Sequence, residues 1–148
     1  MYGRILVTAQ FILIMLLIWP WTAPVFVLPA SLMMLPPLVF GVWILRHNRI
    51  GNFNIRPELK SGAQLITSGP YALVRHPMYV AVLWMGFCVV VFYASATALL
   101  LWGLLFLVLD RKAALEENYL RIHFADYDVY ADKVGRFFPR RPPWRDSV

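Results

Sequence analysis

Residues 68–79 read Ser-Gly-Pro-Tyr-Ala-Leu-Val-Arg-His-Pro-Met-Tyr, and the rest of the chain is interpreted from this stretch. It lies where a polar, basic segment meets a long apolar one, so we place it at a membrane surface. Pro77 suits the first position of a helix, where a missing N–H costs nothing. The unpaired N–H groups and positive dipole end of that helix would face Arg75 and His76. This corner therefore predicts a pocket for an anion, such as the carboxylate of a small cofactor.

A second polar cluster, Glu116-Glu117, follows the next apolar block and could bind a cation. An anion-binding end and a cation-binding end together would suit a zwitterionic amino-acid group. Adjacent helical positions point about 100° apart, so one glutamate is expected to make the main contact, and the sequence does not say which.

Two long apolar blocks set the fold class. The chain is 60% hydrophobic, and residues 5–45 and 76–109 contain no Asp, Glu, Lys or Arg. A membrane span needs about 20 apolar residues, so the first block can hold two spans and the second a tight hairpin of two shorter helices. We predict one all-α domain over residues 1–148: a polytopic membrane helical bundle with spans at about 5–19, 25–45, 77–92 and 96–112, and a cytoplasmic C-terminal helical extension.

The positions of the charges give an orientation. All 14 Lys and Arg fall at Arg4, within 46–75, or after residue 110. With four spans these regions share one side of the membrane, which is the positive-inside pattern. We therefore expect an integral protein of the inner or plasma membrane with both termini cytoplasmic. The net charge of +6 is explained by this placement, and we expect no nucleic-acid partner.

Local signals refine the helices. Pro36-Pro37 should kink the second span because two backbone N–H donors are missing there. Tyr93-Ala94-Ser95 is expected to form the turn of the hairpin. No Pro or Gly interrupts residues 104–121, so one long helix is expected to carry the two glutamates to the cytoplasmic surface. Leu115, Tyr119 and Ile122 are spaced by four and three residues, and their shared face is expected to pack against the other helices.

The histidines and the cysteine do not form a metal-site pattern. Cys88 is the single cysteine and lies in an apolar run, where a packing role is expected. His47, His76 and His123 are scattered with no cysteine at ligand spacing, so no metal site is predicted.

Several motifs in order resemble the isoprenylcysteine carboxyl methyltransferase and phospholipid methyltransferase superfamily. They are Gly69-x-Tyr71, Arg75-His76-Pro77-x-Tyr79, and Glu116-Glu117 after a hairpin of spans. The ending also resembles that of the family, in Phe124-x-x-Tyr127-x-x-Tyr130 and Val134-x-Arg136-x-x-Pro139. The resemblance covers roughly residues 60–139. Where the family usually has Gly two residues after the tyrosine, this chain has Ala81, which is still small.

This resemblance implies S-adenosylmethionine as cofactor and methyl transfer to a lipid-like or membrane-soluble acceptor at the cytoplasmic face. The cofactor site would come from residues 68–79 and 113–139. Glu117→Gln is expected to abolish cofactor binding while the protein stays folded. The implied catalytic residues are Arg75, Glu117 and Arg136, and the implied cofactor-binding residues are Gly69, Tyr71, His76, Pro77, Tyr79, Glu116 and Glu117.

The chemistry of the cofactor agrees with these roles. His76 and the first N–H groups of the helix at Pro77 could hold the cofactor carboxylate, and Glu116 or Glu117 its ammonium or ribose. Tyr71 and Tyr79 could flank the adenine or stabilise the sulfonium by cation–π contact. Arg75 or Arg136 could grip an anionic acceptor. A carboxylate or thiolate acceptor needs no base, whereas an amine or thiol would need one, for which a glutamate or His76 is the candidate.

Other interpretations stay open. The acidic pair could form surface salt bridges with Arg111, Lys112 or Arg121. The chain could be a membrane reductase using NADPH, or a non-catalytic membrane scaffold of the same fold. The acceptor could be a prenylcysteine carboxylate, a phospholipid amine, a small thiol or another lipid. The sequence leaves the oligomeric state open, with a homodimer as one option.

Overall fold

The structure is a computed structural model that describes residues 2–20, 22–48 and 65–140. These residues form six helices and no strand: α1 (Tyr2–Ile18), α2 (Val27–His47), α3 (Pro70–Leu73), α4 (Pro77–Tyr93), α5 (Ala96–His123) and α6 (Tyr127–Lys133). The prediction of an all-helical chain is confirmed for the described residues. The expected starts of all four spans and the ends of the first three differ from the observed helix bounds by three residues or fewer. The fourth helix, α5, continues past residue 112 to His123, in line with the expected helical extension.

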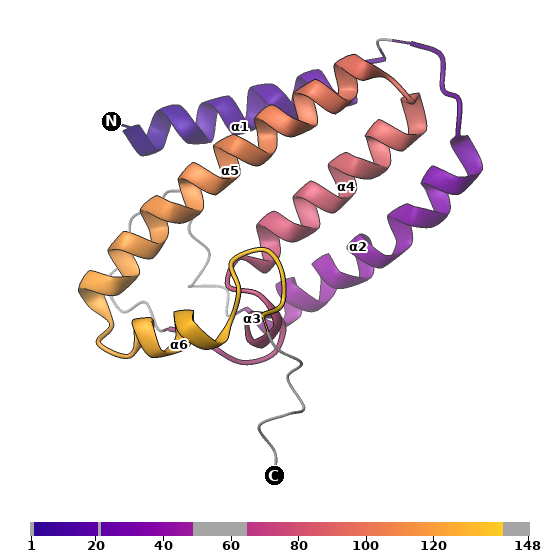
Figure 1. The fold of residues 1–148 in the computed structure, drawn as a ribbon. Coiled ribbons are helices and arrows are strands. Elements are labelled where there is room, and N and C mark those ends of the chain that lie inside the picture. Colours follow the sequence, from indigo (N-terminus) through magenta and orange to yellow (C-terminus); the bar gives the residue numbers. More distant parts are fainter. Residues whose placement is uncertain (1, 21, 49–64, 141–148) are drawn as a thin grey trace.

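The four long helices lie side by side in the order α2, α4, α5, α1 (Figure 1). Their directions alternate, so the start of α1, the end of α2, the start of α4 and the end of α5 gather at one end of the bundle. The short helices α3 and α6 lie at that same end. Motifs about 40 residues apart in the sequence therefore meet there.

The helix ends follow local chemistry. Pro77 is at the start of α4, and Ala94 closes α4 in the left-handed conformation with its N–H donating to the carbonyl of Val90. The expected turn at residues 93–95 is therefore present. Near Ala94, at the end of the bundle opposite α3 and α6, Val25 and Phe26 donate their N–H groups to the carbonyl of Phe92. These hydrogen bonds connect the start of α2 to the turn between α4 and α5.

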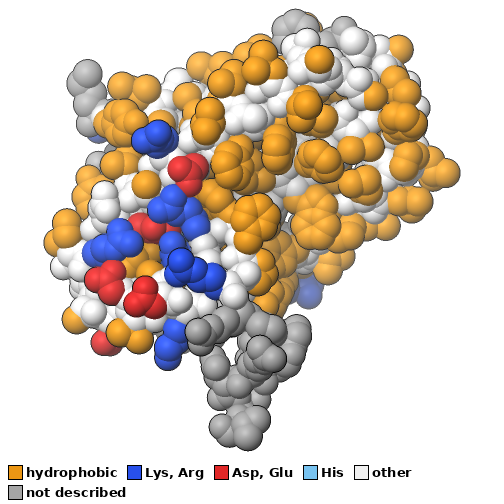
Figure 2. Space-filling model, viewed as in Figure 1, with side chains coloured by type: hydrophobic (Ala, Val, Ile, Leu, Met, Phe, Trp, Pro, Cys, Tyr) orange, Lys and Arg blue, Asp and Glu red, His pale blue; other side chains and the backbone are white. Residues whose placement is uncertain are grey.

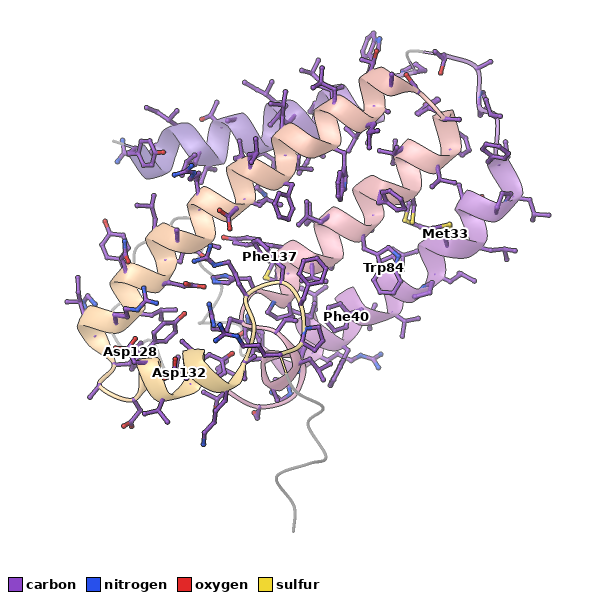
Figure 3. The ribbon with its side chains drawn as sticks, in the orientation of Figure 1. Met33, Phe40, Trp84, Asp128, Asp132 and Phe137 are labelled. Carbon is purple, nitrogen blue, oxygen red and sulfur yellow. The ribbon has the colours of Figure 1, made fainter. Side chains whose placement is uncertain are left out.

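Helix α2 runs without interruption through Pro36 and Pro37, and Pro37 is buried. It is the outermost of the four long helices and packs against α4. Figure 3 labels Met33 and Phe40 on α2 and Trp84 on α4. Many of its other large side chains are exposed, among them Leu28 at 70% and Val39 at 70%.

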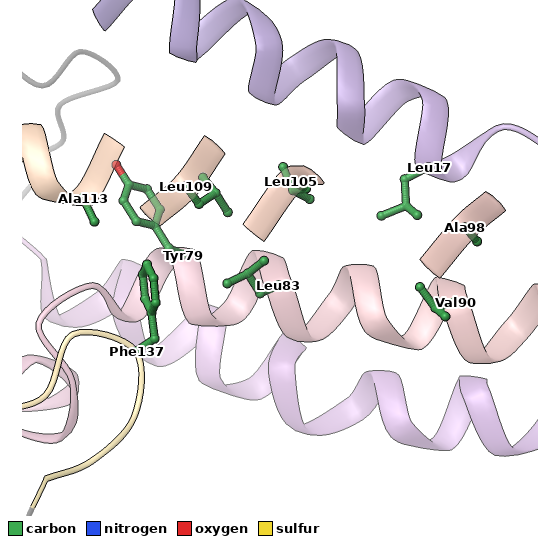
Figure 4. Close-up of a cluster of buried hydrophobic side chains, with 9 residues drawn as sticks. All are labelled: Leu17, Tyr79, Leu83, Val90, Ala98, Leu105, Leu109, Ala113 and Phe137. Carbon is green, nitrogen blue, oxygen red and sulfur yellow. The ribbon is translucent and has the colours of Figure 1, made fainter. Parts of the chain in front are cut away.

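A stripe of apolar side chains forms the core between α4, α5 and α1 (Figure 4). On α5 the buried positions recur every four residues, at Leu105, Leu109, Ala113 and Glu117, so the same face of one helix goes from the apolar core into the polar cluster. The expected packing of Leu115, Tyr119 and Ile122 is wrong, since Ile122 is 78% exposed. Their spacing defines a helical face, but the buried face of α5 is a different one.

By length and composition, one described helix, α2, is long and apolar enough to cross a membrane; α1 and α4 are apolar but have 17 residues each. Apolar side chains cover most of the face in Figure 2, and charged side chains gather towards the end that holds α6. This face of the molecule thus has an apolar body and one charged end.

Candidate functional site

Residues 68–76 form a corner at the charged end of the bundle. Gly69 has a φ of 60°, and a Cβ at this position would collide with the ring of His47, so glycine is required. The His47 ring is hydrogen-bonded to Ser68 Oγ at 3.1 Å. The side-chain amide of Asn48 donates to the Tyr71 hydroxyl at 3.1 Å. The end of α2 therefore fixes the corner from one side.

The segment after α6 fixes the same corner from the other side. Val74 and Gly135 form an isolated parallel bridge. The N–H of Arg75 donates to the carbonyl of Gly135 at 2.8 Å, and the N–H of His76 to the carbonyl of Arg136 at 3.2 Å. The Tyr130 hydroxyl donates to the carbonyl of Tyr71 at 2.7 Å. Residues 134–136 are thereby placed alongside residues 74–76.

Glu117 is the centre of the polar cluster, with its side chain 1% exposed. Its Oε1 accepts from Arg75 Nη2 at 3.0 Å and from Arg136 Nε at 3.0 Å, and lies 3.2 Å from His76 Nε2. Its Oε2 accepts from Arg136 Nη2 at 2.8 Å. One buried carboxylate therefore joins three basic side chains from two distant segments.

The two arginines have further partners. Arg75 Nη1 donates to the carbonyls of Ala131 at 2.7 Å and Val134 at 2.5 Å. Arg136 Nη1 donates to Asp110 Oδ1 at 2.7 Å. Arg75 is 11% exposed and Arg136 30% exposed, so Arg136 is the one that reaches the surface of the cluster. In this arrangement Arg75 positions Glu117 and the C-terminal segment.

Glu116 occupies a different environment from its neighbour. Its Oε1 accepts from the Tyr79 hydroxyl at 2.5 Å, its Oε2 lies 3.5 Å from His76 Nδ1, and its side chain is 20% exposed. The Tyr79 ring stacks on the His76 ring with centroids 5.3 Å apart. Glu116 is thus the accessible member of the acidic pair and Glu117 the buried one.

The pKa values reflect these contacts. Burial on its own would raise the pKa of Glu117, but hydrogen bonds from His76 and Arg136 and the charge of Arg75 lower it well below its usual range. Burial works to lower the pKa of His76, but the two glutamates outweigh it and raise that pKa above 6.5. Glu117 is therefore ionised at neutral pH, and the cluster favours a protonated His76.

Two buried polar atoms near the corner have no hydrogen-bond partner in the described part of the chain: Asn48 Oδ1 and the Tyr127 hydroxyl. Burial, together with the charge of Glu117, raises the pKa of Tyr127 to about 12, so this hydroxyl keeps its proton at neutral pH. Buried polar groups are normally paired, so these two atoms are exceptions among the described residues.

The structure brings together most of the residues that the sequence predicted. Arg75, His76, Tyr79, Glu116, Glu117 and Arg136 share one network of contacts, and Gly69, Tyr71 and Pro77 form the adjoining corner. The acidic pair does not make the alternative contacts expected on its own helix: Glu117 is buried among residues of other segments, and Arg121 pairs with Asp128 at 3.0 Å. The roles of these residues towards a cofactor or acceptor stay predictions.

The sequence reasoning gave no role in the site to four polar residues that lie in or beside the cluster: Gln10, Asn48, Asp110 and Lys112. Lys112 is four residues before Glu116, a spacing that places both on one face of a helix. Asp110 lies seven residues before Glu117 and shares its face for the same reason. Gln10 and Asn48 give no comparable signal, since their partners lie 102 and 23 residues away.

Comparison with known proteins identifies the class. Residues 30–122, more than half of the chain, match the isoprenylcysteine carboxyl methyltransferase family, and the chain belongs to it. The predicted resemblance is confirmed. Members of this family use S-adenosylmethionine.

Two curated relatives are more specific in name. The chain is 29% identical over 92 residues to the nickel-cobalt-cadmium resistance protein NccN of Alcaligenes xylosoxydans xylosoxydans, covering 60% of this chain and 42% of the relative. It is 33% identical over 85 residues to the cobalt-zinc-cadmium resistance protein CzcN of Cupriavidus metallidurans, covering 55% and 38%. The matches span about two fifths of the length of these relatives. No solved structure matches the chain significantly.

Proposed function

We propose that this chain is a membrane methyltransferase that binds S-adenosylmethionine at the charged end of the bundle and methylates a lipid-like or membrane-soluble acceptor. One observation carries the proposal: His76 and Glu117 lie 3.2 Å apart, with Glu116 and Arg136 beside them at the edge of the same cluster. Family membership supplies the cofactor class. Glu116 and Arg136 are the acidic and the basic group of this cluster that reach the surface, and a zwitterionic ligand requires one of each.

The available groups fit the cofactor. Glu116, 20% exposed, can receive its ammonium or ribose hydroxyls, and Arg136, 30% exposed, its carboxylate. Tyr71 offers an aromatic face, and the buried Tyr79 orients Glu116 through its hydroxyl. Asn48 Oδ1, beside Tyr71, has no hydrogen-bond partner among the described residues. The bound cofactor would supply a methyl group on a sulfonium, a strong electrophile.

The remaining site residues hold this arrangement in place. Gly69 allows the turn that presents Tyr71, and Pro77 is the first residue of α4, so that His76 is its N-cap residue. Arg75 and Glu117 fix the distance between the two motifs. Holding acceptor and methyl donor in line and excluding water would provide most of the rate, and a carboxylate or thiolate acceptor would need no base.

The membrane arrangement is part of the proposal. Helices α1, α2, α4 and the apolar first half of α5 would cross the bilayer, with the charged end on the cytoplasmic side. Helix α1 and helix α4, at about 25 Å each, are shorter than a hydrocarbon core of about 30 Å. Local thinning of the bilayer and interfacial anchoring of the flanking residues would accommodate that difference.

The acceptor is the least defined part. The two relatives are named for resistance to nickel, cobalt, zinc and cadmium. In the described segments, no group of three or more His, Cys, Asp or Glu is placed to hold a metal ion. We therefore propose an apolar organic acceptor, methylated at a carboxylate, thiolate or amine.

Ligand binding tests the proposal directly. Purified protein in detergent is titrated calorimetrically with S-adenosylmethionine, and its thermal unfolding is followed with that cofactor and with NADPH. A ligand at 100 times its Kd should stabilise the protein by about 2.7 kcal/mol. Glu116→Gln should weaken binding about tenfold or more, because it removes a charged partner of the ammonium. Asp128→Asn is the matched control, since Asp128 is exposed and pairs with Arg121 outside the cluster.

The outcomes separate the alternatives. Stabilisation by S-adenosylmethionine, lost in Glu116→Gln and kept in Asp128→Asn, supports the proposal. Stabilisation by NADPH alone would favour a reductase. Stabilisation by neither ligand would favour a scaffold without a cofactor. Incubating the protein with methyl-labelled cofactor and a native lipid extract would then identify the acceptor.

A further inference from the structure

Asp110 and Arg136 form a partly exposed ion pair at the edge of the charged cluster. Arg136 Nη1 donates to Asp110 Oδ1 at 2.7 Å. The side chains of Arg136 and Asp110 are 30% and 36% exposed, so solvent reaches both partners. The other two carboxylates of the cluster are less exposed, Glu116 at 20% and Glu117 at 1%. Asp110 is therefore the most accessible carboxylate of the cluster.

The guanidinium of Arg136 contacts two carboxylates along different edges. Its Nε and Nη2 donate to the two oxygens of the buried Glu117 at 3.0 and 2.8 Å, which is the forked contact that guanidinium and carboxylate geometries favour. Its Nη1 donates instead to Asp110. The partner of Nη1 can therefore be exchanged while the forked contact with Glu117 stays in place.

Arg136 does not depend on Asp110 for its position. The N–H of His76 donates to the carbonyl of Arg136 at 3.2 Å. The next residue, Phe137, is 8% exposed and belongs to the apolar core (Figure 4). With Glu117 holding the side chain as well, removal of the Asp110 charge should leave the guanidinium where it is.

We propose that Asp110 occupies the edge of Arg136 that receives the carboxylate of the cofactor, and that the bound cofactor displaces it. This inference rests on the proposed function, which assigns that carboxylate to Arg136. The contact at 2.7 Å shows that this edge accepts a carboxylate. In the absence of a ligand Asp110 supplies a counter-charge to Arg136, and when a ligand carboxylate binds, Asp110 turns to solvent.

Asp110 is then an internal competitor that sets the affinity for ligands with a carboxylate. Two carboxylates at one N–H edge repel each other, so the ligand must replace Asp110 at Nη1 rather than share it. Exposed ion pairs contribute little to stability, so this exchange needs little free energy. The competition acts on the carboxylate of the ligand and not on its amine or sulfonium.

Other roles of Asp110 predict different results. If Asp110 only connects α5 to the segment after α6, Asp110→Asn lowers the unfolding temperature and weakens all ligands alike. If Asp110 orients Arg136 for the cofactor, Asp110→Asn weakens the binding of a carboxylate. Competition alone predicts that Asp110→Asn binds a carboxylate more tightly.

The experiment compares two ligands that differ in the carboxylate. The full chain in detergent is titrated calorimetrically with S-adenosylmethionine and with decarboxylated S-adenosylmethionine. Asp110→Asn should bind S-adenosylmethionine about three- to fivefold more tightly than wild type, the range expected for removal of a partly exposed ion pair. It should bind the decarboxylated form no more tightly than wild type. Asp128→Asn is the matched control, because it removes the same charge from the exposed pair with Arg121.

A second measurement uses the wild-type chain and so does not depend on the folding of a variant. Carbodiimide labelling of carboxylates, followed by mass spectrometry, should increase at Asp110 when S-adenosylmethionine is bound. The decarboxylated form should not increase it, and labelling of Asp128 should stay constant with either ligand.

Equal or weaker binding of S-adenosylmethionine by Asp110→Asn would overturn the inference. So would an equal gain for both ligands, or unchanged labelling of Asp110 in the saturated wild type. These results would leave the proposed function standing, provided that the wild type binds S-adenosylmethionine. Failure of the wild type to bind it would overturn the proposed function itself.

Discussion

Replacing Glu117 by Gln tests whether this buried carboxylate holds the site together. The change keeps the shape of the side chain and removes the charge that Arg75, Arg136 and His76 share at 2.8–3.2 Å. Hydrogen bonds to charged groups contribute about 1.5–3 kcal/mol and neutral ones about 0.5–1.5 kcal/mol. Losing that difference with three partners predicts a fall of about 3–4 kcal/mol in the free energy of unfolding. Breaking a buried ion pair typically costs about 3–5 kcal/mol, which agrees.

The assay is thermal unfolding in detergent followed by circular dichroism. For a chain of this size the loss corresponds to a fall of roughly 6–16 °C in the unfolding temperature. The sequence-based expectation that this variant stays folded and loses cofactor binding stays a prediction, and the structure adds to it this loss of stability. Glu116→Gln is the matched control: its side chain is 20% exposed and accepts one hydrogen bond, from Tyr79, so its cost should be about 1 kcal/mol.

The dependence on pH gives a second readout with a fixed sign. The pKa of Glu117 is lowered in the folded protein, so its contribution to the free energy of unfolding is complete above the ordinary pKa of 4.5. This contribution is lost as the pH falls from there through the lowered, folded-state pKa. The gap between wild type and Glu117→Gln should therefore close on acidification from pH 5 downwards. The pKa of His76 is raised, so its contribution is complete below 6.5 and declines as the pH rises through the folded value. Equal unfolding temperatures at pH 6 for wild type and Glu117→Gln, or an equal loss in Glu116→Gln, would refute this reasoning.

Three further substitutions test how the corner is held. Arg75→Lys removes the forked contacts to the carbonyls of Ala131 and Val134, so hydrogen exchange in α6 should accelerate and stability fall by about 2 kcal/mol; unchanged protection there would contradict the assignment. Gly135→Ala should destabilise the protein because a Cβ would collide with the carbonyl of Phe138, whereas Gly103→Ala, with open space around it, should be neutral or stabilising by about 1 kcal/mol. Gly69→Ala should lower the unfolding temperature, because the φ of residue 69 is positive and the added Cβ would collide with the His47 ring. Adding His47→Ala should recover part of this loss, and no recovery would show that backbone strain alone is responsible.

Much of the fold followed from the sequence because the signals were local. The two blocks without charge set the long helices, Pro77 set the start of α4, and the absence of Gly and Pro after residue 104 predicted one long helix. The meeting of His76 with Glu117 also followed, because an antiparallel hairpin must return its second helix to the level where the first begins.

The features that the sequence did not predict depend on the rotation of a helix about its axis and on contacts between residues far apart in the chain. Which glutamate is buried depends on how α5 is rotated about its axis, and that is set by packing of Leu105 and Leu109 against α4 and α1. Ile122 was misplaced for the same reason. The contacts of Arg75 with backbone carbonyls and of Lys112 with Gln10 join segments 56 and 102 residues apart, and no short-range pattern records them.

The continuity of α5 has a mechanical consequence. From Ala96 to Glu117 the helix is one rod of about 32 Å, with its first half in the apolar layer and its last turns in the charged cluster. A tilt of about 10° at one end would displace the other by roughly 5 Å, more than the length of any hydrogen bond in the cluster. In the proposed membrane arrangement, a change in bilayer thickness that tilts α5 would therefore change the geometry around Glu116 and Glu117.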